Sequence, residues 1–160
     1  MKLKVCGLSN PDEVKICISY NVNFCGFILN YPKSHRYISY EKAKKLLNIN
    51  KNKSKYVGVL VEPSFEELKK FSQLDLDYFQ LYGQFNSESL ANIKKIYKKK
   101  IITTIQVTNK SDIEAYKNVE DESDIILWDS SGYEKSLGWN HNWIKDIKIK
   151  GEKMIAGNIT

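Results

Sequence analysis

The sequence is short of the features that mark several large protein classes. It has three cysteines, an odd number with no CxxC pair, which argues against a disulfide framework or a zinc site and favours a reducing compartment such as the cytoplasm. No apolar run approaches the roughly 18 residues of a membrane span, and the lysine-rich start does not resemble a signal peptide. These absences predict a cytoplasmic protein with no membrane partner.

Charge is unevenly distributed. The net charge is +6, and five of the lysines lie close together near position 97: Lys94, Lys95, Lys98, Lys99 and Lys100. They fall at the end of a predicted helix, where cations are favoured by the helix dipole and are well solvated. A solvated face is the preferred interpretation, and a small basic binding protein is the alternative. No nucleic-acid-binding motif supports a nucleic-acid partner.

The chain is patterned as one globular domain over residues 1–160, with no linker or low-complexity tract. Short, continuous apolar runs alternate with amphipathic helical segments, which is typical of parallel strands covered by helices. Helix starts are predicted from Asn10 followed by Pro11, from Ser39, and from two capping boxes at Ser64 and Ser111. The predicted strands span residues 3–5, 24–29, 56–61, 78–81, 101–106, 125–128 and 154–156.

This order fits either an open doubly wound sheet or a closed eight-fold βα barrel. A dinucleotide fold loses its main support because no GxGxxG follows the first strand. Seven predicted strands and six helices leave the chain one βα unit and one trailing helix short of a barrel. The open sheet and the closed barrel can therefore be distinguished only by the residues at the ends of the strands.

Cys6 and Gly7 stand at the carboxyl tip of the first predicted strand, the edge where βα folds carry out chemistry. A buried, apolar Cys6 is the alternative. Further short segments follow in a specific order: K-V-C-G-L at 4–8, G-F-I at 26–28, S-H-R at 34–36, V-G-V-L-V at 57–61, F-Q-L-Y-G at 79–83, I-L-W-D at 126–129, Gly138 with Trp143, and I-A-G at 155–157. Together they resemble the phosphoribosylanthranilate isomerase family of tryptophan biosynthesis over essentially the whole chain.

The resemblance implies an α/β fold of the (β/α)8 TIM-barrel type, incomplete here, with about seven strands and the eighth βα unit missing. The chain is accordingly expected to be a fragment lacking its C-terminal end, with doubtful activity; an inactive barrel fragment stays open beside the basic binding protein. It departs from the family at Tyr82, where histidine is usual, at Asn158, which replaces a second glycine, and at 135–138, where K-S-L-G replaces a glycine-rich segment.

The reaction that the resemblance implies is an aldose–ketose isomerisation of the intramolecular oxidoreductase type. It is the Amadori rearrangement of N-(5-phosphoribosyl)anthranilate to 1-(2-carboxyphenylamino)-1-deoxyribulose 5-phosphate. In this assignment Cys6 is the general base and Asp129 the general acid, each at a strand end. A helix cap or a solvated loop carboxylate is the alternative for Asp129.

Other positions are assigned to a phosphorylated small-molecule substrate. Arg36 is expected to bind the anthranilate carboxylate as a planar fork, with an exposed loop arginine as the alternative. Gln80 either bonds substrate or fills a core layer. The backbone is expected to approach the ligand at Gly7 and Gly157, and phosphate is assigned to Gly157, Asn158 and Thr160. No metal or organic cofactor is implied, and monomer and homodimer stay open. Five residues are predicted to serve packing or to lie at the surface: Cys17, Cys25, His35, Tyr82 and His141.

Overall fold

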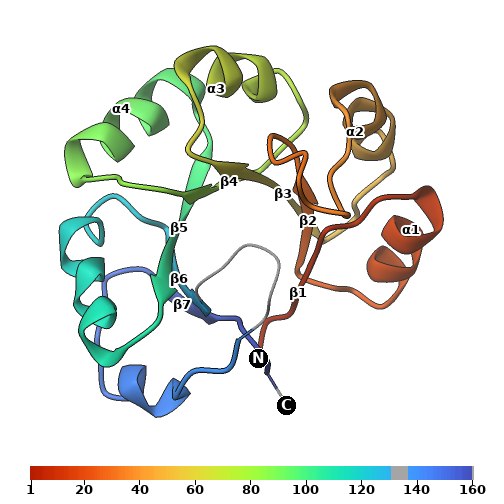
Figure 1. The fold of residues 1–160 in the computed structure, drawn as a ribbon. Helices are drawn as coiled ribbons and strands as arrows, with labels where there is room; N and C mark the ends of the chain where they lie inside the picture. The colour runs from red at the N-terminus through yellow and green to blue at the C-terminus, as the bar shows by residue number, and fades with distance from the viewer. Residues whose placement is uncertain (131–136, 160) are drawn as a thin grey trace. The chain divides into compact units, whose positions relative to one another are not determined.

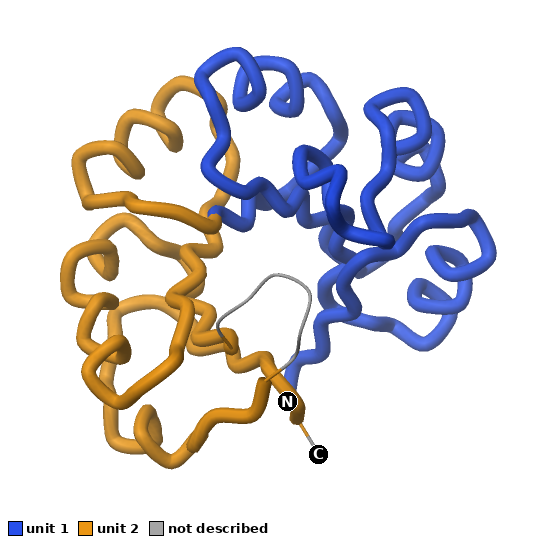
Figure 2. Tube along the Cα trace, viewed as in Figure 1, with its two compact units in different colours: residues 1–81 blue, residues 82–160 orange. Residues whose placement is uncertain are grey.

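The structure, a computed structural model, describes residues 1–130 and 137–159. Strands and helices alternate along the chain (Figure 1), as the apolar pattern predicts. Two compact units divide the chain, residues 1–81 and residues 82–160 (Figure 2). Lys135, Ser136 and Thr160, which carry part of the sequence argument, lie outside the described residues.

The first unit holds four strands and three helices: β1 (Lys4–Cys6), α1 (Pro11–Ser19), β2 (Phe24–Ile28), α2 (Tyr40–Leu47), β3 (Lys55–Val61), α3 (Phe65–Ser72) and β4 (Tyr78–Tyr82), whose last residue begins the second unit. β1 pairs with β2 and β2 with β3, both in parallel, and the register sets Cys6 beside Gly26. Every residue of β2 is buried, as expected for a parallel strand covered on both faces.

The described residues of the second unit form three further strands and three helical segments: α4 (Ser87–Tyr97), β5 (Lys100–Val107), η1 (Lys110–Asn118), β6 (Ile125–Ser130), η2 (His141–Ile144) and β7 (Glu152–Ile155). β5 pairs with β6 and β6 with β7, again in parallel. β6 ends at Ser130, so Asp129 is the penultimate residue of its strand, one residue before the strand end at which it was predicted.

Three of the four predicted helix starts are confirmed. Asn10 and Ser39 accept the expected backbone N–H bonds, and Ser64 forms a capping box with Glu67. The capping box predicted at Ser111 is wrong, because Asn109 caps the segment two residues earlier, with Asp112 as its reciprocal partner. The segment is also a 3₁₀ helix. Its first residues have polar side chains that form hydrogen bonds with the backbone, in competition with the bonds of a regular α-helix.

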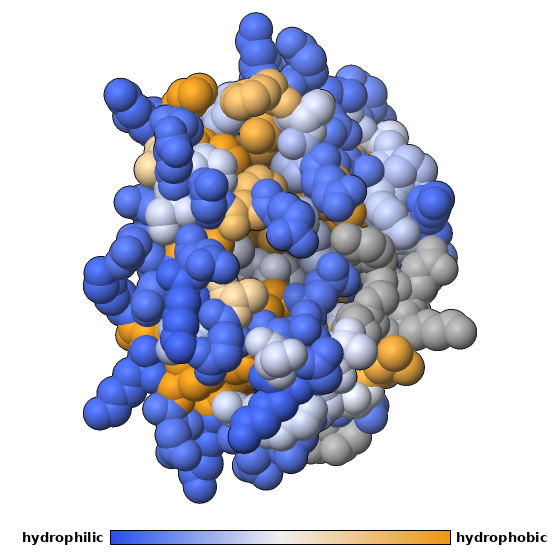
Figure 3. Space-filling model, turned by 60° about the vertical axis from the view of Figure 1, so that its left-hand side comes forward, coloured by the Kyte–Doolittle hydropathy of each residue, from blue (hydrophilic) through white to orange (hydrophobic). Residues whose placement is uncertain are grey.

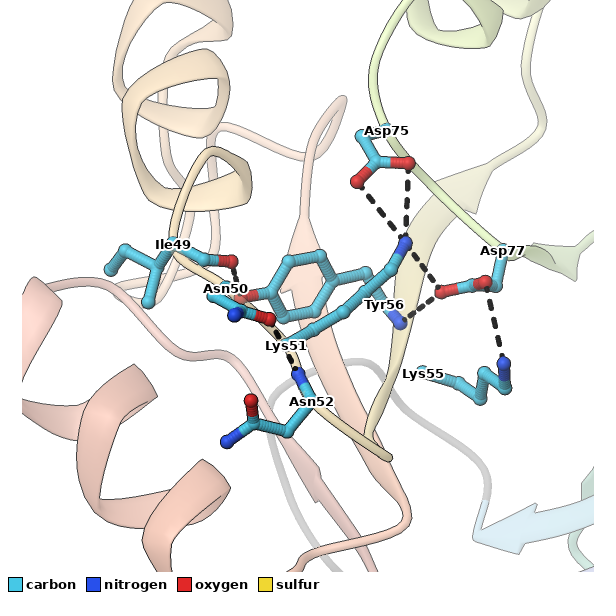
Figure 4. Close-up of polar contacts among 8 residues, drawn as sticks. All are labelled: Ile49, Asn50, Lys51, Asn52, Lys55, Tyr56, Asp75 and Asp77. Atoms are coloured by element: carbon cyan, nitrogen blue, oxygen red, sulfur yellow. Dashed lines mark hydrogen bonds and ion pairs between the residues drawn. The ribbon is translucent and has the colours of Figure 1, made fainter.

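A polar cluster holds the amino ends of β3 and β4 together (Figure 4). The ammonium of Lys51 lies 3.1 Å from carboxylate oxygens of both Asp75 and Asp77. Asp77 also accepts the backbone N–H of Tyr56 at 2.8 Å, and the hydroxyl of Tyr56 donates to the carbonyl of Ile49 at 2.8 Å. Catalytic residues of βα folds lie at the carboxyl ends of the strands. This cluster lies at the amino ends, so its role is to stabilise the fold.

None of the helices in the described part of the chain has the length and apolarity needed to cross a bilayer. Within residues 1–130 and 137–159 there is also no group of three or more histidine, cysteine, aspartate or glutamate side chains that could hold a metal ion.

Candidate active site

In the first unit, candidate residues gather at the carboxyl end of β1. Cys6 ends the strand and is half-buried. Gly7 follows with φ of +82°, a left-handed conformation that glycine adopts without strain. The amides of Gly7 and Leu8 both donate to the carbonyl of Gly26, at 2.9 and 3.0 Å. The chain therefore turns directly after the thiol, which leaves Cys6 at the strand tip as predicted.

Arg36 lies against this turn. Its Nη1 donates to the carbonyl oxygen of Cys6 at 3.0 Å, and its backbone N–H donates to Oγ of the buried Ser34 at 3.2 Å. A Cβ at position 7 would lie 2.6 Å from Cδ of Arg36, so the glycine is what lets the arginine approach. Arg36 is the only arginine in the sequence. The structure thus brings together three of the predicted site residues, Cys6, Gly7 and Arg36.

Lys4 joins this group, although the sequence analysis did not single it out. The Sγ of Cys6 and the Nζ of Lys4 each lie 3.1 Å from the position that a Cβ of Gly26 would take. The signal was present in the sequence, because residues two apart on a strand point to the same face.

Gln80 lies in β4 and is only 1% exposed. A buried glutamine within the strand fits the core-layer alternative as well as it fits a substrate contact. Its predicted role in substrate binding therefore stays a prediction.

In the second unit, the carboxylate of Asp129 is held at both oxygens. Oδ1 accepts the backbone N–H of Ser130 at 2.8 Å, and Oδ2 lies 2.8 Å from the hydroxyl of Tyr82. Asp129 is half-buried and lies within β6. Tyr82, predicted to serve packing, has in addition this polar contact.

Gln106 is a further residue that the sequence analysis missed. It is half-buried near the end of β5, and its Cα is the register partner of Asp129 in β6. Paired residues of neighbouring strands share one face of the sheet. Gln106 could have been identified from the sequence, because it is a polar residue in a largely apolar predicted strand.

A tight turn follows β7 at Gly157 and Asn158. Both have positive φ, at +91° and +50°. A Cβ at position 157 would lie 2.9 Å from the backbone N of Ser130, so only glycine fits there. Trp139 Nε1 donates to the carbonyl of Ala156 at 2.8 Å, and His141 Nε2 lies 3.3 Å from the carbonyl of Gly157. His141, predicted to be a surface residue, is half-buried and helps to hold this turn.

The other two cysteines are core residues, as predicted. Cys17 and Cys25 are both buried. Burial, followed by the neighbouring Cys17, raises the pKa of Cys25 to about 11, and burial also raises the pKa of Cys17. Such thiols are poor nucleophiles at neutral pH.

The lysines near position 97 are partly structural. Lys94 Nζ donates to the carbonyl of Glu122 at 3.1 Å and lies 3.5 Å from Oδ2 of Asp124. Hydrophilic side chains predominate on the face in Figure 3, with smaller apolar areas between them. These observations fit a solvated face and add nothing specific in favour of a basic binding protein.

The model of one protein family, N-(5'-phosphoribosyl)anthranilate (PRA) isomerase, matches residues 3–160. The chain belongs to the phosphoribosylanthranilate isomerase family. The match includes every element that supplies a predicted site residue, from β1 with Cys6 to the turn at Gly157. The resemblance inferred from the sequence segments is therefore confirmed.

Phosphoribosylanthranilate isomerases of several bacteria are similar to the chain. The Sulfurihydrogenibium enzyme is 33% identical over 81% of the chain and 61% of its own length. The Clostridium acetobutylicum enzyme is 31% identical over 99% of the chain and 78% of its own length. The chain thus spans less than two thirds of the first of these relatives.

Solved structures of the family confirm the fold class. The isomerase from Thermotoga maritima has a TM-score of 0.83 at 25% identity, covering 99% of the chain and 78% of that structure. A phosphoribosylanthranilate isomerase in complex with reduced 1-(o-carboxyphenylamino)-1-deoxyribulose 5-phosphate has a TM-score of 0.74 at 24% identity, covering 98% of the chain and 88% of that structure. The predicted α/β fold of the TIM-barrel type, with seven of its strands among the described residues, is therefore confirmed.

Proposed function

We propose that the chain catalyses the phosphoribosylanthranilate isomerase reaction, the aldose–ketose rearrangement of N-(5'-phosphoribosyl)anthranilate. The observation that carries the proposal is the family match over residues 3–160, which includes a thiol and a carboxylate at strand ends. The cytoplasm is the proposed compartment, because all three cysteines are free thiols.

Asp129 is the proposed general acid. Its protonated carboxyl gives a proton to the ring oxygen of the ribose while the bond between C1 and that oxygen breaks. The lone pair of the anthranilate nitrogen moves in to form a C1=N iminium ion, which leaves Asp129 as a carboxylate. The N–H of Ser130 and the hydroxyl of Tyr82 are in place to stabilise that charge.

Cys6 is the proposed general base. Its thiolate removes the proton from C2, and the electron pair of that bond neutralises the iminium to give an enolamine. Transfer of the enol proton to C1 then yields the ketone of the product.

The remaining residues hold the substrate. The guanidinium of Arg36 is suited to the anthranilate carboxylate. The backbone N–H groups of the turn at Gly157 and Asn158 are the proposed donors to the phosphate. Gly7 allows close approach beside Cys6, and Gln80 is proposed as a hydrogen-bonding partner.

The test uses the polypeptide expressed from the gene to its natural stop codon. Turnover of N-(5'-phosphoribosyl)anthranilate is followed by loss of its fluorescence, for the unmodified protein, Cys6→Ser and Asp129→Asn. Each substitution is expected to lower kcat by about 10²–10⁴-fold, the usual contribution of one positioned acid or base.

Asp12→Asn is the matched control, because Asp12 is an exposed carboxylate in the first turn of α1. It is expected to keep full activity. A folded protein without turnover would refute the proposed function, and full activity of Cys6→Ser or Asp129→Asn would refute the assigned role of that residue.

A further inference from the structure

Tyr82 contacts the carboxylate of Asp129 from β4, 47 positions earlier in the sequence. Its hydroxyl lies 2.8 Å from Oδ2, and both residues belong to the second unit. Both side chains are half-buried, so the contact is only partly screened by water. The distance is typical of a hydrogen bond to a charged acceptor.

The two partners of Asp129 differ in what they can do. The backbone N–H of Ser130 can only donate, so it keeps Oδ1 an acceptor whatever the protonation state. The hydroxyl of Tyr82 can donate or accept. In the observed contact it donates to Oδ2, so it fixes that oxygen without binding the proton that the acid has to give to the ring oxygen.

We propose that Tyr82 is a positioning residue for the acid step, which holds Oδ2 of Asp129 in place and then stabilises the carboxylate left behind. This inference rests on the proposed function. A hydroxyl that donates to a developing carboxylate bonds more strongly in the transition state than in the ground state, so its contribution is to kcat. In the resembling family histidine is usual at this position, and its ring N–H is also a donor.

The first experiment compares the unmodified protein with Tyr82→Phe and Tyr82→His in steady-state turnover of N-(5'-phosphoribosyl)anthranilate. Tyr82→Phe keeps the ring and removes only the hydroxyl. It is expected to lower kcat about 10- to 100-fold, as for the loss of one hydrogen bond to a charged group, with KM changed less than about twofold. Tyr82→His is expected to recover much of the lost kcat. Tyr20→Phe, at an exposed tyrosine after α1, is the matched control.

The second experiment is a double-mutant cycle. If Tyr82 acts through Asp129, Tyr82→Phe lowers kcat in the unmodified protein but has almost no further effect in Asp129→Asn. Equal losses in both backgrounds, or an unchanged kcat in Tyr82→Phe, would overturn the inference and leave the proposed function standing. Absence of turnover in the folded, unmodified protein would refute the proposed function and the inference with it.

Discussion

Arg36 donates from Nη1 to the carbonyl oxygen of Cys6 at 3.0 Å, which ties the loop after β2 to the tip of β1. A guanidinium has five N–H donors in a planar fork, so one bond to the backbone leaves capacity for a carboxylate. The same contact that positions the arginine thus places its charge beside the proposed base.

Arg36→Ala is expected to raise KM about 10- to 100-fold with a smaller effect on kcat. The carboxylate of the substrate does not change during the reaction, so its partner contributes equally to ground-state and transition-state binding. Steady-state kinetics of Arg36→Ala and Arg36→Lys measure this, with the neighbouring exposed His35→Ala as control. An unchanged KM in Arg36→Ala would show that the arginine serves only the loop.

Lys51→Met is expected to lower the free energy of unfolding by about 1–2 kcal/mol, because Asp75 and Asp77 lose a hydrogen-bonded cation. Burial opposes the charge on Lys51, yet its hydrogen bonds to both carboxylates outweigh burial and raise its pKa. Urea unfolding measures the change. Lys117→Met is the control: it breaks an exposed ion pair with Glu114 and should change stability by less than about 0.5 kcal/mol.

Alkaline pH is expected to destabilise the fold through Cys25. Its pKa is about 11 in the folded protein against an ordinary 9.0. Below pH 9 the Cys25 thiol is protonated in both the folded and the unfolded protein, so its contribution to the stability of the fold is fully present. Between pH 9 and 11 the unfolded thiol ionises first, so stability falls with a slope of up to about 1.4 kcal/mol per pH unit.

Urea unfolding of the unmodified protein and of Cys25→Ala between pH 8 and 11 tests this expectation. The substitution should lower stability at pH 8 through the lost packing and should flatten the alkaline slope. Val14→Ala, at a fully buried residue that does not titrate, should lower stability and leave the slope as it is. Parallel pH dependences in all three proteins would contradict the assignment.

The strands and most helix starts could be predicted from the sequence because their signals are local. Apolar runs located all seven strands to within two residues at each end, and Asn10, Ser39 and Ser64 cap helices as predicted. The start near Ser111 failed because several residues in that stretch can cap a helix, and Asn109 forms the observed box. Local propensity does not distinguish such neighbours.

The polar contacts of the site could be predicted only in part. The strand-end positions of Cys6 and Asp129 follow from where the apolar runs stop. The bond between Tyr82 and Asp129 does not, because it joins strands far apart in the sequence and depends on the orientation of a long side chain. Lys4 lay within reach of a sequence argument, since strand alternation places it on the face of Cys6.

Gly26 limits how this chain can evolve. A methyl group at that position would have to fit against both Cys6 Sγ and Lys4 Nζ at 3.1 Å, and the backbone of Cys6 at 3.3 Å. A side chain at position 26 therefore has to displace the groups around Cys6, although Gly26 itself carries no functional group. A complete substitution scan of β2 is expected to show low tolerance at this position.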